Sequence, residues 1–282
     1  MDSLATRLWS QFIAPHLQNP PGLALVALGG YGRQWLFPYS DIDILFLYAG
    51  SSEEEKHKIR VRQFSQEIWD LRLKLSPASR KLSECDRFDP GNLEFAISLL
   101  DCRYLAGDAK IFRNLHDGAI PRMAGREAKI LVERLSDLTR ARHAKYGFTV
   151  YHLEPNVKDG PGGLRDINLA SWLSLISAME SLGGWPGDTS LLPAPAREKF
   201  ASALEFMMSV RCFLHFRHGR DDNTLAWEAQ EEAAARKIGV RTEEAATASD
   251  WMRVYFSHAR AIHRVSSQLL GEIPASRPSL HR

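Results

Sequence analysis

The sequence has few cysteines and no long apolar run, and both shortages narrow the classes of protein to which it can belong. Its three cysteines, Cys85, Cys102 and Cys212, are odd in number and far apart, which argues against a disulfide framework and a Cys-x-x-Cys zinc site. No apolar stretch approaches the roughly 20 residues that a helix needs to cross a bilayer. The start, Met1-Asp2-Ser3, lacks the basic and apolar residues of a secretory signal. We therefore expect a cytoplasmic protein without a membrane partner.

A strong excess of charge of either sign is also missing. The chain has 36 lysines and arginines against 34 acidic residues, a net charge of +2 over 282 residues. Nothing in this balance requires a nucleic acid as partner, and we expect none. A hydrophobic content of 44% and a charged content of 25% are typical of folded globular proteins, and the length suffices for two ordinary domains.

Hydrophobic periodicity predicts an α+β fold, in which a small mixed-sheet domain precedes a helical-bundle domain. Strands are expected at 23–28, 42–48 and 72–82, the third interrupted at Pro77. The expected helices are 4–14, 51–71, 91–106, 108–117, 124–145, 166–182, 196–218, 227–238 and 245–271. The expected domains are 1–120 and 121–273, with a flexible tail at 274–282.

Two aspartates, Asp41 and Asp43, stand at the start of the second expected strand. Residues two apart in a strand point to the same face, so both carboxylates project together while Ile42 and Ile44 point into the core. Neighbouring carboxylates repel each other unless a cation lies between them. Magnesium suits such a pair because it binds oxygen and keeps positions open for phosphate oxygens. The pair predicts a magnesium site, although an isolated Asp-x-Asp is more often surface decoration.

A glycine-rich turn follows the first expected strand. Because glycine has no Cβ, Gly29 and Gly30 allow backbone N–H groups to approach a phosphate, and Arg33 adds a charge-assisted contact. Ser40 is expected to orient the turn that leads to Asp41. The glycine turn alone would be weak, but a phosphate cradle about ten residues before paired carboxylates describes a nucleotidyl-transfer site.

Two long sequence blocks are more specific than either pattern. The first consists of residues 28–33 and 36–45, the second of residues 154–167, and weaker similarities follow at 210–215 and 218–220. With these blocks in this order, the chain resembles the bacterial protein-PII uridylyltransferases from residue 23 to about 270. That family belongs to the DNA polymerase β-like nucleotidyltransferase superfamily.

The resemblance implies an enzyme with two magnesium ions that transfers UMP from UTP to a tyrosine of a PII-like signalling protein in nitrogen regulation. It implies Asp41 and Asp43 as metal ligands. The family also carries an HD domain that removes UMP and two ACT domains that sense glutamine, and neither fits in this chain. The dipeptide His116-Asp117 lacks the flanking ligands of such a hydrolase. A natural short relative and an excised catalytic fragment both remain open.

Some positions depart from the family pattern. Gln34 and Trp35 replace the usual Gly-Glu, and Ser76–Lys81 keeps only the arginine of the usual third-strand sequence. Lys74 stands where the superfamily's third carboxylate is expected, which leaves Glu84 or Asp101 as substitutes, and we count Asp101 among the catalytic candidates. Two alternatives therefore stay open: a catalytically weak nucleotide- or PII-binding regulatory module, and AMP transfer to another protein.

The second block offers two further cations. Lys158 lies in a glycine-rich segment from which it could reach the β- or γ-phosphate, and Arg165 stands where the next helix begins. The alternative is a structural hinge in which Arg165 pairs with a carboxylate of the first domain. His215 and His218 have no third ligand nearby in the sequence and are expected to be core or surface histidines.

Overall fold

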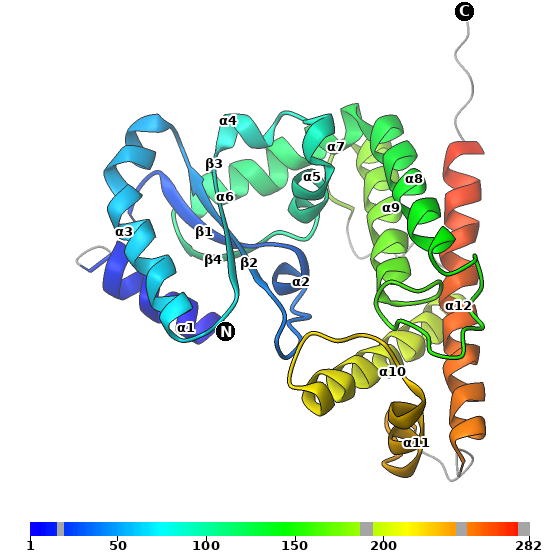
Figure 1. Cartoon of the computed structure of the whole chain (residues 1–282). Coiled ribbons are helices and arrows are strands. Elements are labelled where there is room, and N and C mark those ends of the chain that lie inside the picture. Colours follow the sequence, from blue (N-terminus) through cyan, green and yellow to red (C-terminus); the bar gives the residue numbers. More distant parts are fainter. Residues whose placement is uncertain (16–19, 187–193, 241–246, 276–282) are drawn as a thin grey trace, which may run out of the picture. The chain divides into compact units, whose positions relative to one another are not determined.

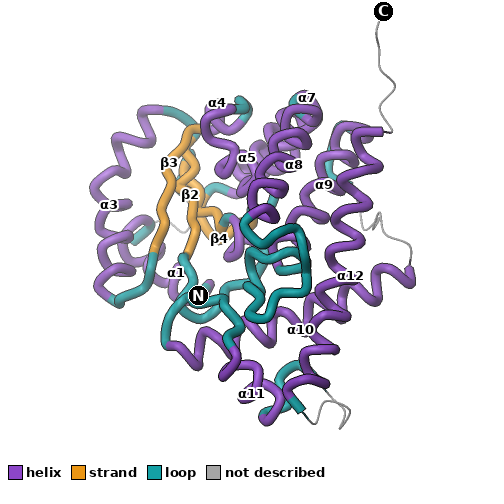
Figure 2. The backbone as a smooth tube through the Cα atoms, turned by 45° about the vertical axis from the view of Figure 1, so that its right-hand side comes forward, coloured by secondary structure: helices purple, strands orange, loops and turns teal. Residues whose placement is uncertain are grey.

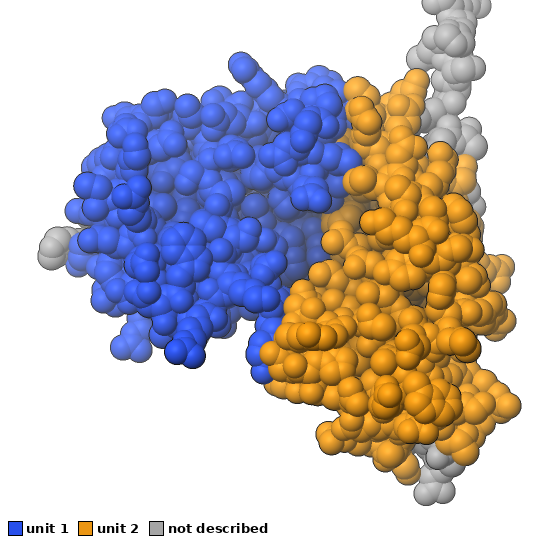
Figure 3. All heavy atoms as spheres, viewed as in Figure 1, with its two compact units in different colours: residues 1–127, 178–185 blue, residues 128–177, 186–282 orange. Residues whose placement is uncertain are grey.

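The computed structural model describes residues 1–15, 20–186, 194–240 and 247–275. The chain divides into two compact units, coloured separately in Figure 3: unit 1 comprises 1–127 and 178–185, and unit 2 comprises 128–177 and 186–282. The expected α+β class is confirmed, since a mixed four-stranded sheet lies in unit 1 and unit 2 is helical. Residue 120, the expected boundary, lies inside unit 1, where Ile120 is buried. Of the expected tail, 276–282 lies outside the described residues.

Unit 1 is built on the sheet β3-β2-β1-β4 (Figure 1). The strands are β1 (Leu23–Ala27), β2 (Ile42–Tyr48), β3 (Leu75–Lys81) and β4 (Arg103–Gly107). β1 pairs antiparallel with both β2 and β4, whereas β2 and β3 run parallel. All five residues of β1 are buried, as expected of a central strand covered on both faces.

Helices cover both faces of this sheet, with α3 on one side and α4 and α5 on the other (Figure 2). The helical elements of unit 1 are α1 (Asp2–Leu8), η1 (Trp9–Ile13), α2 (Gly29–Gly32), α3 (Ser51–Asp70), α4 (Leu82–Cys85), η2 (Pro90–Asn92), α5 (Leu93–Leu99), α6 (Ala109–Arg113), η3 (Asn114–Ala119) and α7 (Ile120–Arg126). On the α3 face, Ile42 and Ile44 join a core in which the rings of Phe46 and Phe64 meet edge to face at 5.5 Å. Leu45 and Leu47 point to the opposite face and are also buried.

The expected helix 91–106 is wrong in its second half. Only Leu93–Leu99 is α-helical, and Arg103–Gly107 forms β4 against β1. The apolar spacing of this segment suits a helix, but pairing with an already buried strand outweighs that local preference. Register shifts at Leu25 and Val26 and the positive φ of +95° at Gly107 accommodate the pairing.

The expected interruption at Pro77 is also wrong, because β3 runs through it without a break. The Ile42 N–H donates to the Lys74 carbonyl at 2.7 Å, so Lys74, Ser76 and Ala78 form the side of β3 that bonds to β2. The Pro77 nitrogen then faces the free edge of the sheet. A proline is tolerated there because no neighbouring strand needs an N–H donor.

Unit 2 consists of five helices in the residues described: α8 (Ala128–Ala144), α9 (Leu164–Leu182), α10 (Ala194–His218), α11 (Trp227–Ala235) and α12 (Ala248–Ala275). The last residues of α9, from Ala178, cluster with unit 1. Phe206 of α10 packs against Trp251 and Tyr255 of α12, with ring centroids 5.5 and 6.3 Å apart. Across the described parts of the chain, no helix has the length and apolar content of a membrane span.

The second block forms the irregular connection between α8 and α9, and its glycines lie where side chains cannot. A Cβ on Gly162, which has a φ of +77°, would lie 2.2 Å from the Ala259 carbonyl oxygen of α12. A Cβ on Gly160 would lie 2.6 Å from the Asn156 carbonyl oxygen. These glycines therefore allow the loop to fold tightly on itself and against α12.

We expect Gly162→Ala to lower the free energy of unfolding by at least roughly 2 kcal/mol, because it combines a left-handed backbone with a clash against backbone. The matched control is Gly147→Ala, where φ is +57° but no atom lies within 4 Å of the added Cβ. This control should cost only about 1 kcal/mol. Urea unfolding followed by circular dichroism measures both, and equal losses would contradict the close packing against α12.

Candidate functional site

The expected alternation of aspartates and isoleucines at the start of β2 is confirmed. Ile42 and Ile44 are only 2% and 1% exposed, whereas Asp43 is half-buried and Asp41 is exposed. The Leu28 N–H donates to the Asp43 carbonyl at 2.9 Å, which holds the end of β1 beside this part of β2. Asp41 and Asp43 therefore lie on the face opposite the α3-side core. They stand at the end of the sheet where β1 ends and β2 begins.

The glycine turn lies directly against Asp43. It forms the one-turn helix α2, and Gly29 at its start has a φ of +50°. A Cβ on Gly29 would lie 3.0 Å from Asp43 Oδ2, a tight contact that, together with the positive φ, favours glycine at this position. The Trp35 N–H donates to the Gly30 carbonyl at 2.8 Å and closes the turn. The first N–H groups of a helix have no partner within it, and Gly29, at the start of this one, lies beside Asp43.

Arg33 is anchored by Asp101, which follows α5. Arg33 Nη1 donates to Asp101 Oδ2, and the two side chains are 18% and 5% exposed. The Arg33 guanidinium carbon lies 5.4 Å from the centre of the Trp35 ring. A Cβ on Gly32 would lie 1.9 Å from the Asp101 carbonyl oxygen, so only glycine allows the turn to contact Asp101 in this way. In the structure the Asp101 carboxylate binds Arg33.

A third metal-ligating side chain does not join Asp41 and Asp43 among the described residues. Glu84 lies beyond Lys81, the last residue of β3, and its Oε2 accepts the Lys81 N–H at 2.7 Å. Since β2 and β3 are parallel, with Asp43 opposite Ser76 and Tyr48 opposite Lys81, Glu84 lies at the other end of the sheet. Beside the aspartates lie Lys74, immediately before β3, and Ser76 of β3.

The residues at this place fit a divalent cation on oxygen ligands. Asp41 and Asp43 supply two carboxylates on one face, and the glycine turn keeps bulky groups away from Asp43. Ser40 Oγ, immediately before Asp41, is buried and has no hydrogen-bond partner in the part of the chain that the structure describes. An orphaned buried hydroxyl is costly unless a ligand or water satisfies it.

The two cations of the second block already have partners within unit 2. Lys158 Nζ lies 3.7 Å from Asp221 Oδ2, and Arg165 Nε lies 2.5 Å from Asp159 Oδ1. Asn156 Oδ1 accepts the backbone N–H groups of Lys158 and Asp159, which shapes this turn. The carboxylate that pairs with Arg165 thus belongs to its own loop, whereas the hinge alternative required one from the first domain.

Asp166, at the start of α9, is the centre of a buried cluster. Its carboxylate is fully buried and contacts Arg142 Nη2 at 2.6 Å and His143 Nε2 at 2.9 Å, and it accepts the Gly162 N–H at 2.7 Å. Burial alone would raise the pKa of this carboxyl, but the contacts with His143, His263 and Arg142 outweigh it and hold the pKa below its usual range. Asp166 therefore stays ionised and ties the second block to α8 and α12.

Asp166, His143 and His263 are also the one group with metal-ligand spacing among the described residues. Arg142 and His143 both bind Asp166 Oδ1, and the Gly162 N–H occupies Oδ2. A metal ion there would displace hydrogen bonds and lie beside the Arg142 guanidinium, which it would repel. The contacts are those of a buried structural carboxylate.

A second polar cluster links the weaker similarity at 210–215 to the second block. Arg211 Nε donates to Asn223 Oδ1 at 2.7 Å, and His215 Nε2 lies 3.1 Å from Asp221 Oδ1. His215 is fully buried, as a core histidine would be. The arginine and histidine stand four apart on one helix, a spacing that places them on one face, but their partners in 221–223 are not evident from the sequence.

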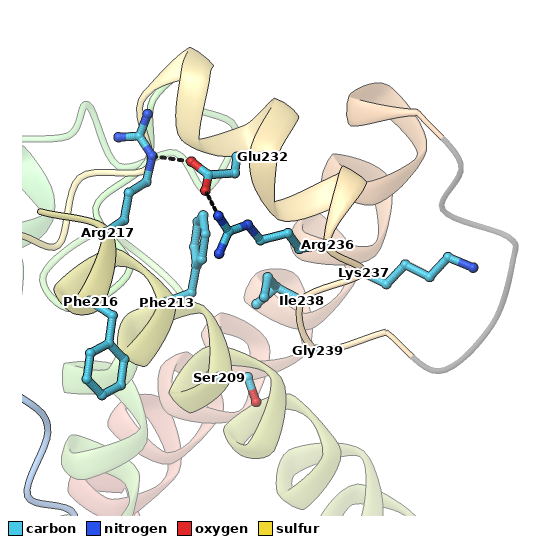
Figure 4. A pocket seen from close by; sticks show the side chains of 9 residues that line it. All are labelled: Ser209, Phe213, Phe216, Arg217, Glu232, Arg236, Lys237, Ile238 and Gly239. Atoms are coloured by element: carbon cyan, nitrogen blue, oxygen red, sulfur yellow. Dashed lines mark hydrogen bonds and ion pairs between the residues drawn. The ribbon is translucent and has the colours of Figure 1, made fainter.

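A surface hollow of about 890 Å³ lies beside α10 and α11, with its lining residues drawn in Figure 4. Arg217 and Arg236 both bind Glu232, each at 2.7 Å, and Phe213 and Phe216 contribute apolar surface. None of the site residues expected from the sequence lines it.

We expect Asp166→Asn to lower the free energy of unfolding by about 3 kcal/mol at neutral pH, because it leaves the buried Arg142 charge without its counter-charge. The pKa of Asp166 is lowered by folding, so its contribution is fully present above the unfolded value near 4 and is lost as the pH falls below it. The stability difference between the variant and the wild type should therefore shrink in acid.

The control for this substitution is Asp137→Asn, since Asp137 is 66% exposed and pairs with Arg140 on the surface of α8. It should change stability by less than about 0.5 kcal/mol. Urea unfolding at several pH values between neutral and acid measures both variants. A difference that stays constant down to the lowest pH would show that ionisation of Asp166 is not the source.

Comparisons with known proteins show the family to which the chain belongs. Residues 128–270 match the family model described as GlnD PII-uridylyltransferase. The bifunctional uridylyltransferase/uridylyl-removing enzymes of Cupriavidus pinatubonensis and Pseudomonas entomophila are 34% and 32% identical over 263 and 272 residues. Those alignments cover 92% and 96% of this chain but 29% of each relative, so the chain spans under a third of their length. The chain belongs to the PII-uridylyltransferase family.

Proposed function

We propose that this chain is a magnesium-dependent nucleotidyltransferase that moves UMP from UTP to a tyrosine of a PII-like signalling protein. Family membership supports the class of reaction, and the contact of the Gly29 turn with the Asp43 carboxylate is the structural observation that carries the proposal. The cytoplasm as the place of action and a part in nitrogen regulation belong to the same proposal.

In this proposal Asp41 and Asp43 hold the metal. Bound magnesium would neutralise triphosphate charge and polarise the phosphorus that is attacked. The N–H groups at Gly29 and Gly30 would bind phosphate oxygens. Because neither residue has a Cβ, a phosphate could approach their backbone closely beside Asp43. Ser40 Oγ would donate to the same ligand, which would satisfy a hydroxyl that is otherwise buried without a partner in the described residues.

Arg33 would contact the phosphates, and Asp101 would act through it. The carboxylate of Asp101 is almost fully buried on Arg33, so it restrains the guanidinium instead of offering oxygens to a metal. Asp101, which the sequence suggested as a catalytic residue, is therefore a positioning residue in this proposal.

In the proposed transfer, the tyrosine oxygen forms a bond to the α-phosphorus of UTP. The bond between that phosphorus and the oxygen bridging to the β-phosphate breaks. Pyrophosphate leaves, and the phenolic proton passes to solvent or to a nearby carboxylate. The protein contributes position and charge more than covalent chemistry, as in other phosphoryl transfers.

For Lys158 and Arg165 we propose a mainly structural part. Each already pairs with a carboxylate of unit 2, Asp221 and Asp159, and contact with a phosphate would require it to exchange that partner. Lys158 connects the second block to the cluster around His215, and Arg165 closes the loop that Asp166 anchors.

The alternative of a nucleotide-binding regulatory module rests on one observation, the lack of a third metal-ligating side chain beside Asp41 and Asp43 in the described residues. Such a module would bind UTP without transferring UMP. The donor could also be ATP with another acceptor protein, since the residues named in this proposal would contact phosphate and metal and not a base.

We expect Asp43→Asn to reduce UMP transfer by at least roughly a thousandfold, because it removes a metal ligand, while the melting temperature stays the same or rises. Relief of repulsion between neighbouring carboxylates explains a rise. Transfer of labelled UMP or AMP to a PII protein, with magnesium, measures activity, and calorimetry with UTP measures binding.

Glu84→Gln is the matched control, because the parallel register places Glu84 at the far end of the sheet, and it should keep transfer within about threefold. Binding of UTP without transfer by the wild type would favour the regulatory module. A clearly lower melting temperature for Asp43→Asn would make Asp43 a structural residue, and no binding of any nucleotide would overturn the proposal.

A further inference from the structure

The residue immediately before β3, beside the two aspartates, is a lysine and not a carboxylate. Ile42 stands opposite Leu75 and Asp43 opposite Ser76 in the parallel register, and the Ile42 N–H donates to the Lys74 carbonyl. Neighbouring strands lie about 4.8 Å apart. The Lys74 backbone therefore flanks Asp41, just as Ser76 flanks Asp43.

Ser76 lies on the same face of the sheet as Asp43, and the backbone of Lys74 lies beside Asp41. Leu75 is buried in the same core as Ile42, on the α3 side of the sheet. Because successive residues of a strand alternate between faces, Ser76 points to the opposite side, together with Asp43. Lys74 lies immediately before β3, in a turn closed by the Leu75 N–H and the Leu73 carbonyl, and its own carbonyl accepts the Ile42 N–H beside Asp41. Lys74 is exposed, so its long stem is free to direct the ammonium toward a ligand at the aspartates.

The charge of this group suits one divalent cation. Two carboxylates and one ammonium sum to a formal charge of −1, and among the described residues no third acidic, histidine or cysteine side chain completes a metal-binding group with the aspartates. A second divalent ion beside Asp41 would have to approach the Lys74 ammonium, which repels it, without a further protein ligand to compensate.

We infer that the site holds its nucleotide with a single divalent cation on Asp41 and Asp43, and that the Lys74 ammonium supplies the positive charge at the place of a second ion. The inference rests on the proposed function, because it concerns the same nucleotide site. It makes Lys74 a positioning residue for the triphosphate.

Manganese ions bound to the full chain can be counted by electron paramagnetic resonance in the presence of a non-hydrolysable UTP analogue. The wild type should bind one Mn²⁺ for each analogue. Lys74→Glu should bind two, since it adds a carboxylate and removes the repelling charge. Lys74→Gln is the matched control: it should still bind one Mn²⁺, because it adds no carboxylate, and should bind the analogue on the order of tenfold more weakly.

Two ions in the wild type, or one in Lys74→Glu, would overturn the inference, as would unchanged affinity of Lys74→Gln for the analogue. Lys74 is exposed, so these substitutions should leave the circular dichroism spectrum unchanged. The number of Mn²⁺ ions bound by the wild type decides between one ion and two even if a variant fails to fold. Two ions with tight analogue binding would leave the proposed function intact. A wild type that binds neither Mn²⁺ nor the analogue would instead overturn the proposed function itself.

Discussion

The candidate site depends on a turn in which two positions, Gly29 and Gly32, have no room for a side chain. At Gly29 an added Cβ would press on the Asp43 carboxylate, and at Gly32 it would overlap the Asp101 carbonyl oxygen. These two contacts place the backbone beside the aspartates and bring Arg33 onto Asp101. A larger residue at Gly29 would crowd the Asp43 carboxylate, and one at Gly32 would force the turn away from the Asp101 backbone.

Unit 2 is organised by a buried charge in a comparable way. Asp166 collects contacts from α8, from its own loop and from α12, so three distant segments meet at one carboxylate. The polar cluster of Arg211, His215 and Asp221 repeats this arrangement a short distance along the chain, and Lys158 connects it to the second block. The long motif that helped to identify the family is thus largely a folding motif in this structure.

Short-range patterns in the sequence predicted a good part of the site. The two-residue period places Asp41 and Asp43 on one face, and glycine spacing indicates the turn, because both depend on neighbouring residues alone. The pair Arg33 and Asp101 is separated by 68 positions, and no local pattern connects its members. The same is true of β4. Its apolar spacing alone predicts a helix, and only its pairing with the distant strand β1 makes it a strand.

The parallel register of β2 and β3 could not be derived from composition either, although it decides which residues surround the aspartates. An offset of one residue would turn Ser76 to the α3 face and bring Leu75 to the site. The site therefore depends on a hydrogen-bond ladder as much as on its own side chains, and the bond from the Ile42 N–H to the Lys74 carbonyl is its first bond beside the aspartates.

Pro77, on the outer strand of the sheet, affects how separate copies of the chain can associate in solution. β3 is the last strand of its sheet, and a strand edge with free donors and acceptors invites pairing with another molecule. Pro77 removes one donor from the middle of that edge, and its ring projects where an incoming backbone would have to lie. The molecule can thus keep a parallel strand at its border, with lysine and serine beside the aspartates, and still resist edge-to-edge aggregation.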